Sequence, residues 1–363
     1  MLLFILPAVF FTLQGCGNKS SSETNHSNSD VILNEEETTT STIPPSASET
    51  VKNSYAKLVQ FDALMDRKMA AFDAVVDYES RVCPPTSLIL DGEYCDIEWN
   101  FFKRGSGTFL HHACEDRLVV KVQSPPLLSV MEGLWREEAA SLVLSDSVLF
   151  PTVFHPDYSK GEYYVTDLCE LQLLVTPYVD GFSLEESLYM FGPEKPEIVV
   201  QMAVRLIDIF EIVHRAGLVH GDVHMGNVLC SDGDDMPGSL HLIDFGRSRP
   251  FIDGKTGEVL TKMVVDIPLM DLNLSMLSIW ELENSGALSP RDDLFRLAEM
   301  LIELHSGYSA TAPSSPIPRE QAKMKRLRDL SKYPDSFANF YKATMETPFG
   351  QLPDYNVLRA YFL

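Results

Sequence analysis

Basic side chains are scarce in this sequence of 363 residues, which holds 29 Lys and Arg against 52 Asp and Glu and has a net charge of −23. So acidic a surface repels phosphate groups, and we therefore expect neither nucleic acid nor a specific membrane surface as a partner. The same net charge is also explained by solubility alone, without any effect on the choice of partner. Apolar residues make up 45% of the chain, which is enough for a substantial core.

The beginning of the chain lacks a basic residue before Thr12 and an apolar run long enough to span a bilayer comfortably. Its apolar stretch, up to Leu13, is followed by small residues and a polar run, which is typical of a secretory signal peptide cleaved after Gly17. We therefore expect a signal peptide over residues 1–17 and a secreted or secretory-pathway protein. A signal-anchor stays open as an alternative, and residues 13–16 also resemble a bacterial lipoprotein box.

Cysteine is rare too, with six residues in the chain, and no CxxC pair or Cys/His metal spacing is present. The sequence therefore gives no indication of a cysteine-based metal site. Removal of Cys16 with the signal peptide would leave five cysteines, so at least one thiol would be free or intermolecular. Cys83 and Cys95 could pair across a short loop.

Two segments precede the main domain. Residues 18–54 are rich in Ser, Thr, Asn and Glu and hold almost no large apolar side chains, which predicts a disordered tether. From Tyr55 to Tyr78 apolar residues recur at helical spacing, and we predict an amphipathic helix within residues 55–83. This helix either packs on the main domain or binds a partner.

The remaining chain changes from strand-like to helical patterns at about Gly181. Strand-like runs are 97–102, 117–122, 162–168 and 171–176, and helical segments are about 129–144, 184–190, 196–216, 291–305, 319–331 and 335–345. This order predicts an α+β domain over residues 88–363, with a small β-rich lobe (88–179) before a larger helical lobe (180–363).

The strongest chemical signal lies in residues 220–246, which contain H-x-D, an Asn five residues after the Asp, and an apolar strand that ends in Asp-Phe-Gly. The H-x-D motif, the Asn and the Asp-Phe-Gly motif each have a role in phosphoryl transfer. Asp222 could orient a hydroxyl nucleophile and accept its proton. Asn227 and Asp244 are hard oxygen ligands for two Mg²⁺ ions, or Mn²⁺. Gly246 would allow a sharp backbone turn after the metal ligand.

These motifs resemble the protein-kinase superfamily, whose catalytic loop is H-R-D-x-x-x-x-N and whose metal motif is D-F-G. The resemblance implies a bilobal protein-kinase-like fold that binds ATP with Mg²⁺ or Mn²⁺. A segment between two strand-like runs resembles the glycine-rich loop that covers the ATP phosphates; it consists of Gly105, Ser106, Gly107, Thr108 and Phe109. Leu110 replaces the third glycine of that loop.

By the same resemblance, Lys121 is the strand lysine that pairs with the α- and β-phosphates, and its valine neighbours argue against an exposed position. This lysine should meet a helix glutamate. The candidates are Glu132, Glu137 and Glu138. Kinases place an apolar residue one helical turn after this glutamate. Leu142 follows Glu138 at that distance, whereas Ser141 follows Glu137, so we predict Glu138 as the partner.

Residues 173–181 resemble the hinge between kinase lobes. Thr176 would then be the gatekeeper, Pro177 would offer its carbonyl to adenine, and Val179 would offer its N–H. Read alone, the segment is also consistent with an ordinary buried strand.

Two motifs resemble casein kinase I and the vaccinia-related kinases. Residues 289–294 match S-x-R-D-D-L, and residues 353–359 match P-D-Y-x-x-L-R. The resemblance covers about residues 99–363. It implies that Asp293 holds the catalytic loop from beneath, and that the protein phosphorylates Ser or Thr in a protein substrate.

Three features depart from these kinases. Gly221 replaces the Arg of H-R-D, so we expect no basic site for a phosphate on the activation segment and no need for that phosphorylation. His224 stands where a protein kinase has the Lys that neutralises the γ-phosphate, and it would be only partly charged. H-G-D-x-H-x-G-N instead resembles aminoglycoside and choline kinases. Residues 259–283 lack an A-P-E segment.

Three functions follow as hypotheses. An active, divergent Ser/Thr protein kinase is the main one, and a small-molecule or carbohydrate kinase on the same fold is the second. A pseudokinase that only binds partners is the third. The core residues Lys121, Asp222, Asn227 and Asp244 are all present, which argues against the third.

Overall fold

The computed structural model describes residues 56–73, 87–90, 93–104, 108–114, 117–123, 128–145, 173–231, 240–261, 277–284, 287–307 and 317–363. The predicted signal peptide, tether and strand 162–168 lie outside these ranges. So do the first three residues of the predicted glycine-rich loop, 105–107. What the sequence predicts for these segments stays a prediction.

One part of the molecule is a five-stranded antiparallel sheet with the strand order β1-β2-β3-β4-β5. Its strands are β1 (Ser87–Leu90), β2 (Glu93–Arg104), β3 (Thr108–Ala113), β4 (Leu118–Gln123) and β5 (Leu173–Pro177). Side chains alternate between the faces of a strand, so β4 buries Leu118 and Val120 on one face and presents Lys121 on the other. The alternation along β4 therefore places the lysine on the face opposite to Leu118 and Val120.

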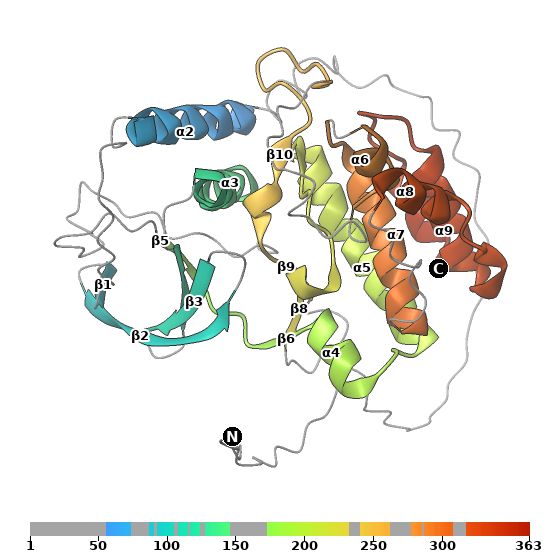
Figure 1. The fold of residues 1–363 in the computed structure, drawn as a ribbon, viewed down its shortest axis with the longest axis horizontal. Helices are drawn as coiled ribbons and strands as arrows, with labels where there is room; N and C mark the ends of the chain where they lie inside the picture. The colour runs from blue at the N-terminus through green and yellow to red at the C-terminus, as the bar shows by residue number, and fades with distance from the viewer. Residues whose placement is uncertain are drawn as a thin grey trace, which may run out of the picture.

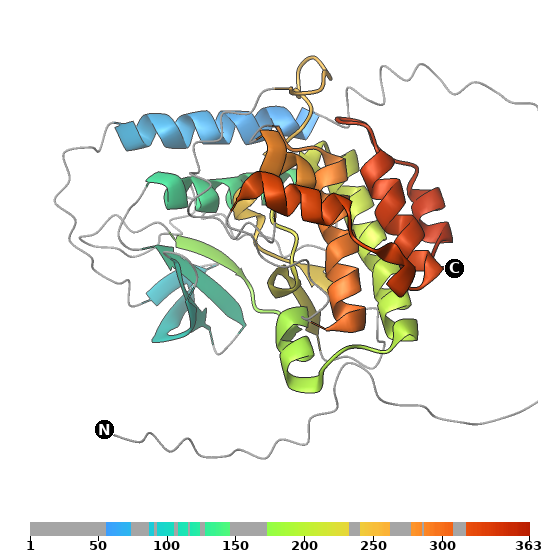
Figure 2. The ribbon, with the colours of Figure 1, turned by 45° about the vertical axis from the view of Figure 1, so that its right-hand side comes forward.

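Helix α3 (Leu128–Leu144) lies beside this sheet, and α2 (Ala56–Asp73) packs on the outer side of α3 (Figures 1 and 2). Three apolar side chains of α2 that recur every three residues are buried: Leu58, Phe61 and Leu64. Gly254, in the loop after β10, also meets α2, because a Cβ there would lie only 2.9 Å from Cβ of Leu58. The helix predicted within residues 55–83 therefore packs on the domain itself.

The rest of the molecule is mainly helical (Figure 1). Its helices are α4 (Leu184–Phe191), α5 (Pro196–Arg215), α6 (Ile279–Asn284), α7 (Pro290–Ser306), α8 (Pro318–Arg326), α9 (Asp335–Glu346) and α10 (Tyr355–Ala360). Helices α5 and α7 run side by side through the centre, and α9 packs on α7. The helix predicted over 319–331 ends early, at Arg326, and a short 3₁₀ turn (Leu330–Lys332) follows.

Short strands and turns between the two parts carry the chemical motifs (Figure 1). Strands β6 (Gly181–Ser183), β8 (Val228–Ser231) and β9 (Leu240–Leu242) form one sheet, and β7 (Leu218–Val219) pairs with β10 (Arg249–Pro250). The 3₁₀ turns are η2 (Met225–Asn227) and η3 (Phe245–Arg247). The predicted α+β fold, a small sheet-rich part before a larger helical part, is thus confirmed.

Within the described ranges, no helix combines the length and the apolar character that crossing a membrane requires.

Candidate active site

Lys121 on β4 is held by two carboxylates. Its Nζ lies 2.8 and 2.6 Å from the two carboxylate oxygens of Glu137 on α3, and 3.5 Å from Oδ1 of Asp244. Burial alone would lower the pKa of Lys121, but the charges of Asp244 and Glu137 outweigh it and raise that pKa. The lysine is therefore a fixed cation at the junction of the sheet, α3 and the Asp-Phe-Gly motif.

The predicted partner of this lysine, Glu138, was wrong by one residue. The apolar contact behind the pair comes from Leu134, which lies one helical turn before Glu137 and packs on Leu174 of β5. Adjacent helix residues point about 100° apart, so this packing turns Glu137 toward β4 and leaves Glu138 on a different face. An apolar residue one turn after the glutamate was the wrong criterion for this helix.

Asp244 has a left-handed backbone (φ 65°, ψ 69°), which is uncommon for a residue with a side chain and occurs often at functional sites. Its side chain is 48% exposed, so the carboxylate is accessible. The sequence predicted Gly246 as the residue that allows the turn, but Gly246 is not the residue with positive φ. A Cβ at Gly246 would lie 3.2 Å from Asp244 Oδ1 and 3.4 Å from the carbonyl of Gly133, so this glycine permits the close approach of α3.

The catalytic loop is closed by internal hydrogen bonds. Asn227 Nδ2 donates to the backbone carbonyl of Asp222 at 2.9 Å, and the Asp222 N–H donates to His220 Nδ1 at 3.2 Å. The other ring nitrogen of His220 lies 3.1 Å from the carbonyl of Ile243, and its ring meets Phe245 edge-on at 4.7 Å. The loop is thereby attached to the Asp-Phe-Gly strand.

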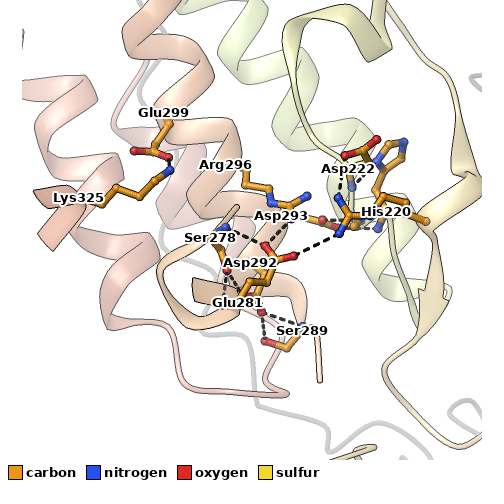
Figure 3. A network of polar contacts seen from close by, with 12 residues as sticks. His220, Asp222, Ser278, Glu281, Ser289, Asp292, Asp293, Arg296, Glu299 and Lys325 are labelled. Atoms are coloured by element: carbon orange, nitrogen blue, oxygen red, sulfur yellow. Dashed lines mark hydrogen bonds and ion pairs between the residues drawn. The ribbon is translucent and has the colours of Figure 1, made fainter. Parts of the chain in front are cut away.

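Asp293 on α7 holds this loop from beneath, as predicted. Its two carboxylate oxygens accept the backbone N–H groups of His220 at 2.7 Å and Gly221 at 2.9 Å. Figure 3 shows Asp293 beside His220. His214 Nε2 lies 3.0 Å from the same carboxylate, and its Nδ1 lies 2.6 Å from the hydroxyl of Tyr355 in the second predicted motif. Burial alone would raise the pKa of Asp293, but these hydrogen bonds and neighbouring imidazoles outweigh it and lower that pKa.

His224 lies beside Asp222 at the mouth of the loop. Its Nδ1 accepts the N–H of Gly226 at 3.1 Å, and its Nε2 lies 3.7 Å from Asp222 Oδ2. Burial alone would raise the pKa of Asp222, but His224 and Arg247 outweigh it and hold that pKa well below its usual range. The carboxylate of Asp222 is therefore ionised at neutral pH.

The predicted hinge residues continue the sheet toward the helical part. Thr176 and Pro177 end β5, where they pair with Val119 and Leu118 of β4, and the N–H of Tyr178 donates to the carbonyl of Arg117 at 2.9 Å. Val179 follows in the segment that leads to β6. The predicted loop residues Thr108 and Phe109 begin β3, where Phe109 pairs with both β2 and β4. Strand β5, which leads into the hinge, thus lies on one side of β4. The hairpin of β2 and β3 lies on the other side.

Arg247 is a site residue that the sequence reasoning missed. Its Nη1 lies 3.1 Å from Asp222 Oδ1, and its Nη2 lies 3.6 Å from Oε1 of Glu281. The signals that could have revealed it were its place directly after Asp-Phe-Gly and the missing arginine at Gly221.

The side chains that could hold a metal at this site are those of Asp244 and Asn227. Asn227 commits its amide nitrogen to Asp222, an orientation in which the amide oxygen remains an acceptor. A carboxylate and an amide oxygen fit Mg²⁺ or Mn²⁺, which commonly completes its coordination with phosphate oxygens and water. Elsewhere in the described residues, no group of three or more His, Cys, Asp or Glu side chains forms an alternative metal site.

Comparisons with known proteins agree with this geometry. The family model of the ABC1 atypical kinase-like domain matches residues 164–275, which include the catalytic loop and the Asp-Phe-Gly motif. A probable serine/threonine-protein kinase of Streptomyces coelicolor, SCO3848, is 26% identical over 257 residues, covering 68% of this chain and 36% of that protein. Serine/threonine-protein kinase PknL of Mycobacterium tuberculosis is 30% identical over 139 residues, covering 38% of this chain and 31% of PknL.

Among solved structures, that of vaccinia related kinase 3 aligns with a TM-score of 0.59 and 18% identity, over 81% of this chain and 93% of the other. At that identity the likeness shows the fold alone, and the fold is that of a protein kinase. The chain spans about a third of the length of the two curated relatives.

Proposed function

Because this chain is a divergent member of the protein-kinase-like superfamily, we propose that it transfers the γ-phosphate of ATP to a Ser or Thr hydroxyl of a protein. The observation that carries the proposal is the ion pair of Lys121 and Glu137 beside Asp244. A lysine held by a helix glutamate next to a metal-binding aspartate is the arrangement that phosphoryl transfer requires in kinases.

Each part of the site has a role in nucleotide binding. Lys121 would pair with the α- and β-phosphates, and the loop over 105–109 would cover them. Pro177 O and Val179 N–H would meet adenine. Asp244 and Asn227 would hold Mg²⁺ or Mn²⁺, which supplies positive charge against the phosphates. The Lys121 charge and the exposed Asp244 carboxylate support this division of roles.

Asp222 would orient the acceptor hydroxyl and take its proton. Its ionised carboxylate supports this role, because only the anion can accept a proton. His224, beside Asp222, would contact the γ-phosphate where protein kinases use a lysine. The Ser/Thr preference is supported by the names of the curated relatives, which are serine/threonine-protein kinases.

A small-molecule or carbohydrate kinase is the second candidate. The observation that favours it is the position of His224, which sits beside the base with Gly226 N–H fixed on its ring. An imidazole there neutralises phosphate less than a lysine would and can hydrogen-bond a small polyol or amino alcohol. The match to an atypical kinase-like family also keeps this candidate open.

The test is phosphate transfer from labelled ATP by the full chain, with Mg²⁺ or Mn²⁺, to mixed protein substrates and separately to sugars and amino alcohols. Loss of protein labelling in Asp222→Ala would support the protein kinase. Labelling of a small hydroxyl compound instead would establish the second candidate. Tight Mg·ATP binding without transfer to any acceptor would contradict both and indicate a partner-binding pseudokinase.

The secretory location is also a proposal. It is supported by the pattern of residues 1–17, an apolar stretch followed by small residues and a polar run. Expression of the full chain in a secreting host should release protein that begins at Asn18. Retention of the intact chain, with residues 1–17 still attached, would contradict the proposal.

A further inference from the structure

The guanidinium of Arg247 joins the catalytic loop to helix α6. Its Nη1 donates to Asp222 Oδ1 at 3.1 Å, and its Nη2 lies 3.6 Å from Glu281 Oε1. The three side chains are each at least three-quarters buried. At these distances and this burial, the contacts are screened less than a surface ion pair. Arg247 therefore has fixed partners at both ends of its guanidinium.

Glu281 is itself held in place. The backbone N–H of Ser278 donates to its Oε2 at 2.7 Å, and Arg296 of α7 pairs with the same oxygen. Ser278 in turn donates its hydroxyl to Asp292 Oδ1 at 2.6 Å. Figure 3 shows Ser278, Glu281 and Asp292 gathered between Ser289 and Arg296. The partner that holds Arg247 is thus anchored to α7, the central helix.

The backbone at Gly221 explains why the arginine comes from residue 247. Gly221 has φ 74°, and a Cβ there would lie 2.7 Å from the carbonyl oxygen of Arg247. A side chain at 221, where related kinases carry arginine, would therefore displace the backbone of Arg247. The glycine and the arginine belong to one arrangement, in which the guanidinium beside the catalytic loop is supplied after the Asp-Phe-Gly motif.

We propose that Arg247 is a positioning residue for Asp222. It holds one carboxylate oxygen of Asp222, and the chain Arg247–Glu281–Arg296 attaches that carboxylate to α7. In kinases with an arginine in the catalytic loop, a phosphate on the activation segment can pair with that arginine and order the segment. In this protein the carboxylate of Glu281 takes the place of that phosphate. The inference rests on the phosphotransferase function proposed above.

The first test compares the steady-state kinetics of the full chain with those of Arg247→Ala and Arg247→Lys. Misplacement of a catalytic group lowers the rate of the chemical step, so we expect kcat to fall by about 10- to 100-fold in Arg247→Ala. The KM for Mg·ATP should change less than about twofold, because nucleotide contacts remain. Arg247→Lys should recover part of kcat. Arg215→Ala, an exposed arginine of α5, is the matched control.

The contact of Arg247 with Glu281 is tested by Glu281→Gln, alone and combined with Arg247→Ala. If the two residues act as one unit, the double variant should lose no more kcat than Arg247→Ala alone. Thermal unfolding is measured for each variant, because Glu281 also pairs with buried Arg296. Phosphatase treatment of the unchanged protein should leave kcat the same.

Hydrogen exchange over residues 218–228 gives a readout that needs no acceptor. Exchange should be faster in Arg247→Ala than in Arg215→Ala, since the Asp222 loop loses a support. If Arg247→Ala leaves both the exchange and kcat unchanged, the positioning role is overturned. The role is also overturned if Arg247→Ala lowers nucleotide affinity as much as it lowers kcat. Absence of phosphate transfer by the unchanged protein, with faster exchange in Arg247→Ala, would instead overturn the phosphotransferase function.

Discussion

Lys121 Nζ lies within 2.8 Å of both carboxylate oxygens of Glu137, while Asp244 Oδ1 lies at 3.5 Å. The lysine is therefore already oriented between α3 and the Asp-Phe-Gly motif. Helix α2 packs on the far side of α3 (Figure 2). Leu58 of α2 also meets Gly254, which follows that motif in the sequence. The position of α3, on which the pair depends, is thus supported by α2, which in turn contacts the loop after β10.

The first prediction separates two adjacent glutamates. Glu137→Gln should lower kcat/KM for Mg·ATP by about 10- to 100-fold, because Lys121 loses the charge that orients it. Glu138→Gln should change kcat/KM less than about twofold. Steady-state kinetics at varied Mg·ATP measure both. A larger effect of Glu138→Gln would contradict the pairing.

The second prediction concerns the metal. Asp244→Asn should weaken binding of Mg·ATP by about 100-fold or more, because an anionic Mg²⁺ ligand is lost while the fold is kept. Calorimetric titration with a non-hydrolysable ATP analogue and Mg²⁺ measures this change, and Asp66→Asn on the exposed side of α2 is the control. Undiminished affinity in Asp244→Asn would exclude Asp244 as a metal ligand.

The third prediction concerns Asp293. Its carboxylate is fully buried and accepts hydrogen bonds from His220 and Gly221, so Asp293→Asn presents an N–H₂ group to one of those donors. Loss of one partner of a buried charged network costs about 3–5 kcal/mol in the free energy of unfolding. Denaturant unfolding measures it beside Asp180→Asn, an exposed control. A loss below about 1 kcal/mol would mean that the loop does not depend on this carboxylate.

The fourth prediction is a pH dependence of stability. Burial, with the charge of Glu299, raises the pKa of Glu303 to about 7, from 4.5 for a free glutamate. Between these values the unfolded chain releases a proton that the folded chain keeps, so the free energy of unfolding falls as the pH rises from about 4.5 to 7. The difference between the two pKa values corresponds to roughly 3 kcal/mol in the free energy of unfolding.

Glu303→Gln should therefore raise the free energy of unfolding at pH 8 and reduce its slope between pH 5 and 7. Part of the slope should remain, because burial also raises the pKa of Asp292 to about 6. Denaturant titrations at several pH values measure both quantities, with Glu346→Gln as an exposed control. An unchanged slope in Glu303→Gln would show that Glu303 stays ionised in the folded protein.

The sequence predicted that Asp222 and Asn227 belong to one loop, because they stand at fixed spacing within one short segment, and the structure joins them by a hydrogen bond. Their roles, and that of Asp244 as a metal ligand, stay predictions. The sequence did not predict the partner of Lys121, since Glu137 and Glu138 are adjacent and the rotation of α3 depends on tertiary packing, such as the contact of Leu134 with Leu174, 40 residues away in sequence. Such packing is a property of the folded chain. Local pattern therefore cannot choose between the two glutamates.

Arg247 was missed for a related reason. Its partner Glu281 lies on another helix, and its approach to the catalytic loop depends on the backbone of Gly221. The sequence indicated that an arginine was missing at 221 but gave no sign of where a replacement would come from. The replacement is recognised only by its contacts in the folded protein, with Asp222 on one side and Glu281 on the other.

The last prediction separates the two enzyme candidates through His224. In a protein kinase, His224→Lys should preserve or raise transfer to protein, because a full positive charge would face the γ-phosphate beside Asp222. In a small-molecule kinase, the same change removes an imidazole that contacts the acceptor, and transfer should fall by about 10-fold or more. Transfer assays with both acceptor classes measure this difference, and His241→Lys on β9 is the control. A large loss of transfer to protein in His224→Lys would contradict the role assigned to His224 in the protein kinase.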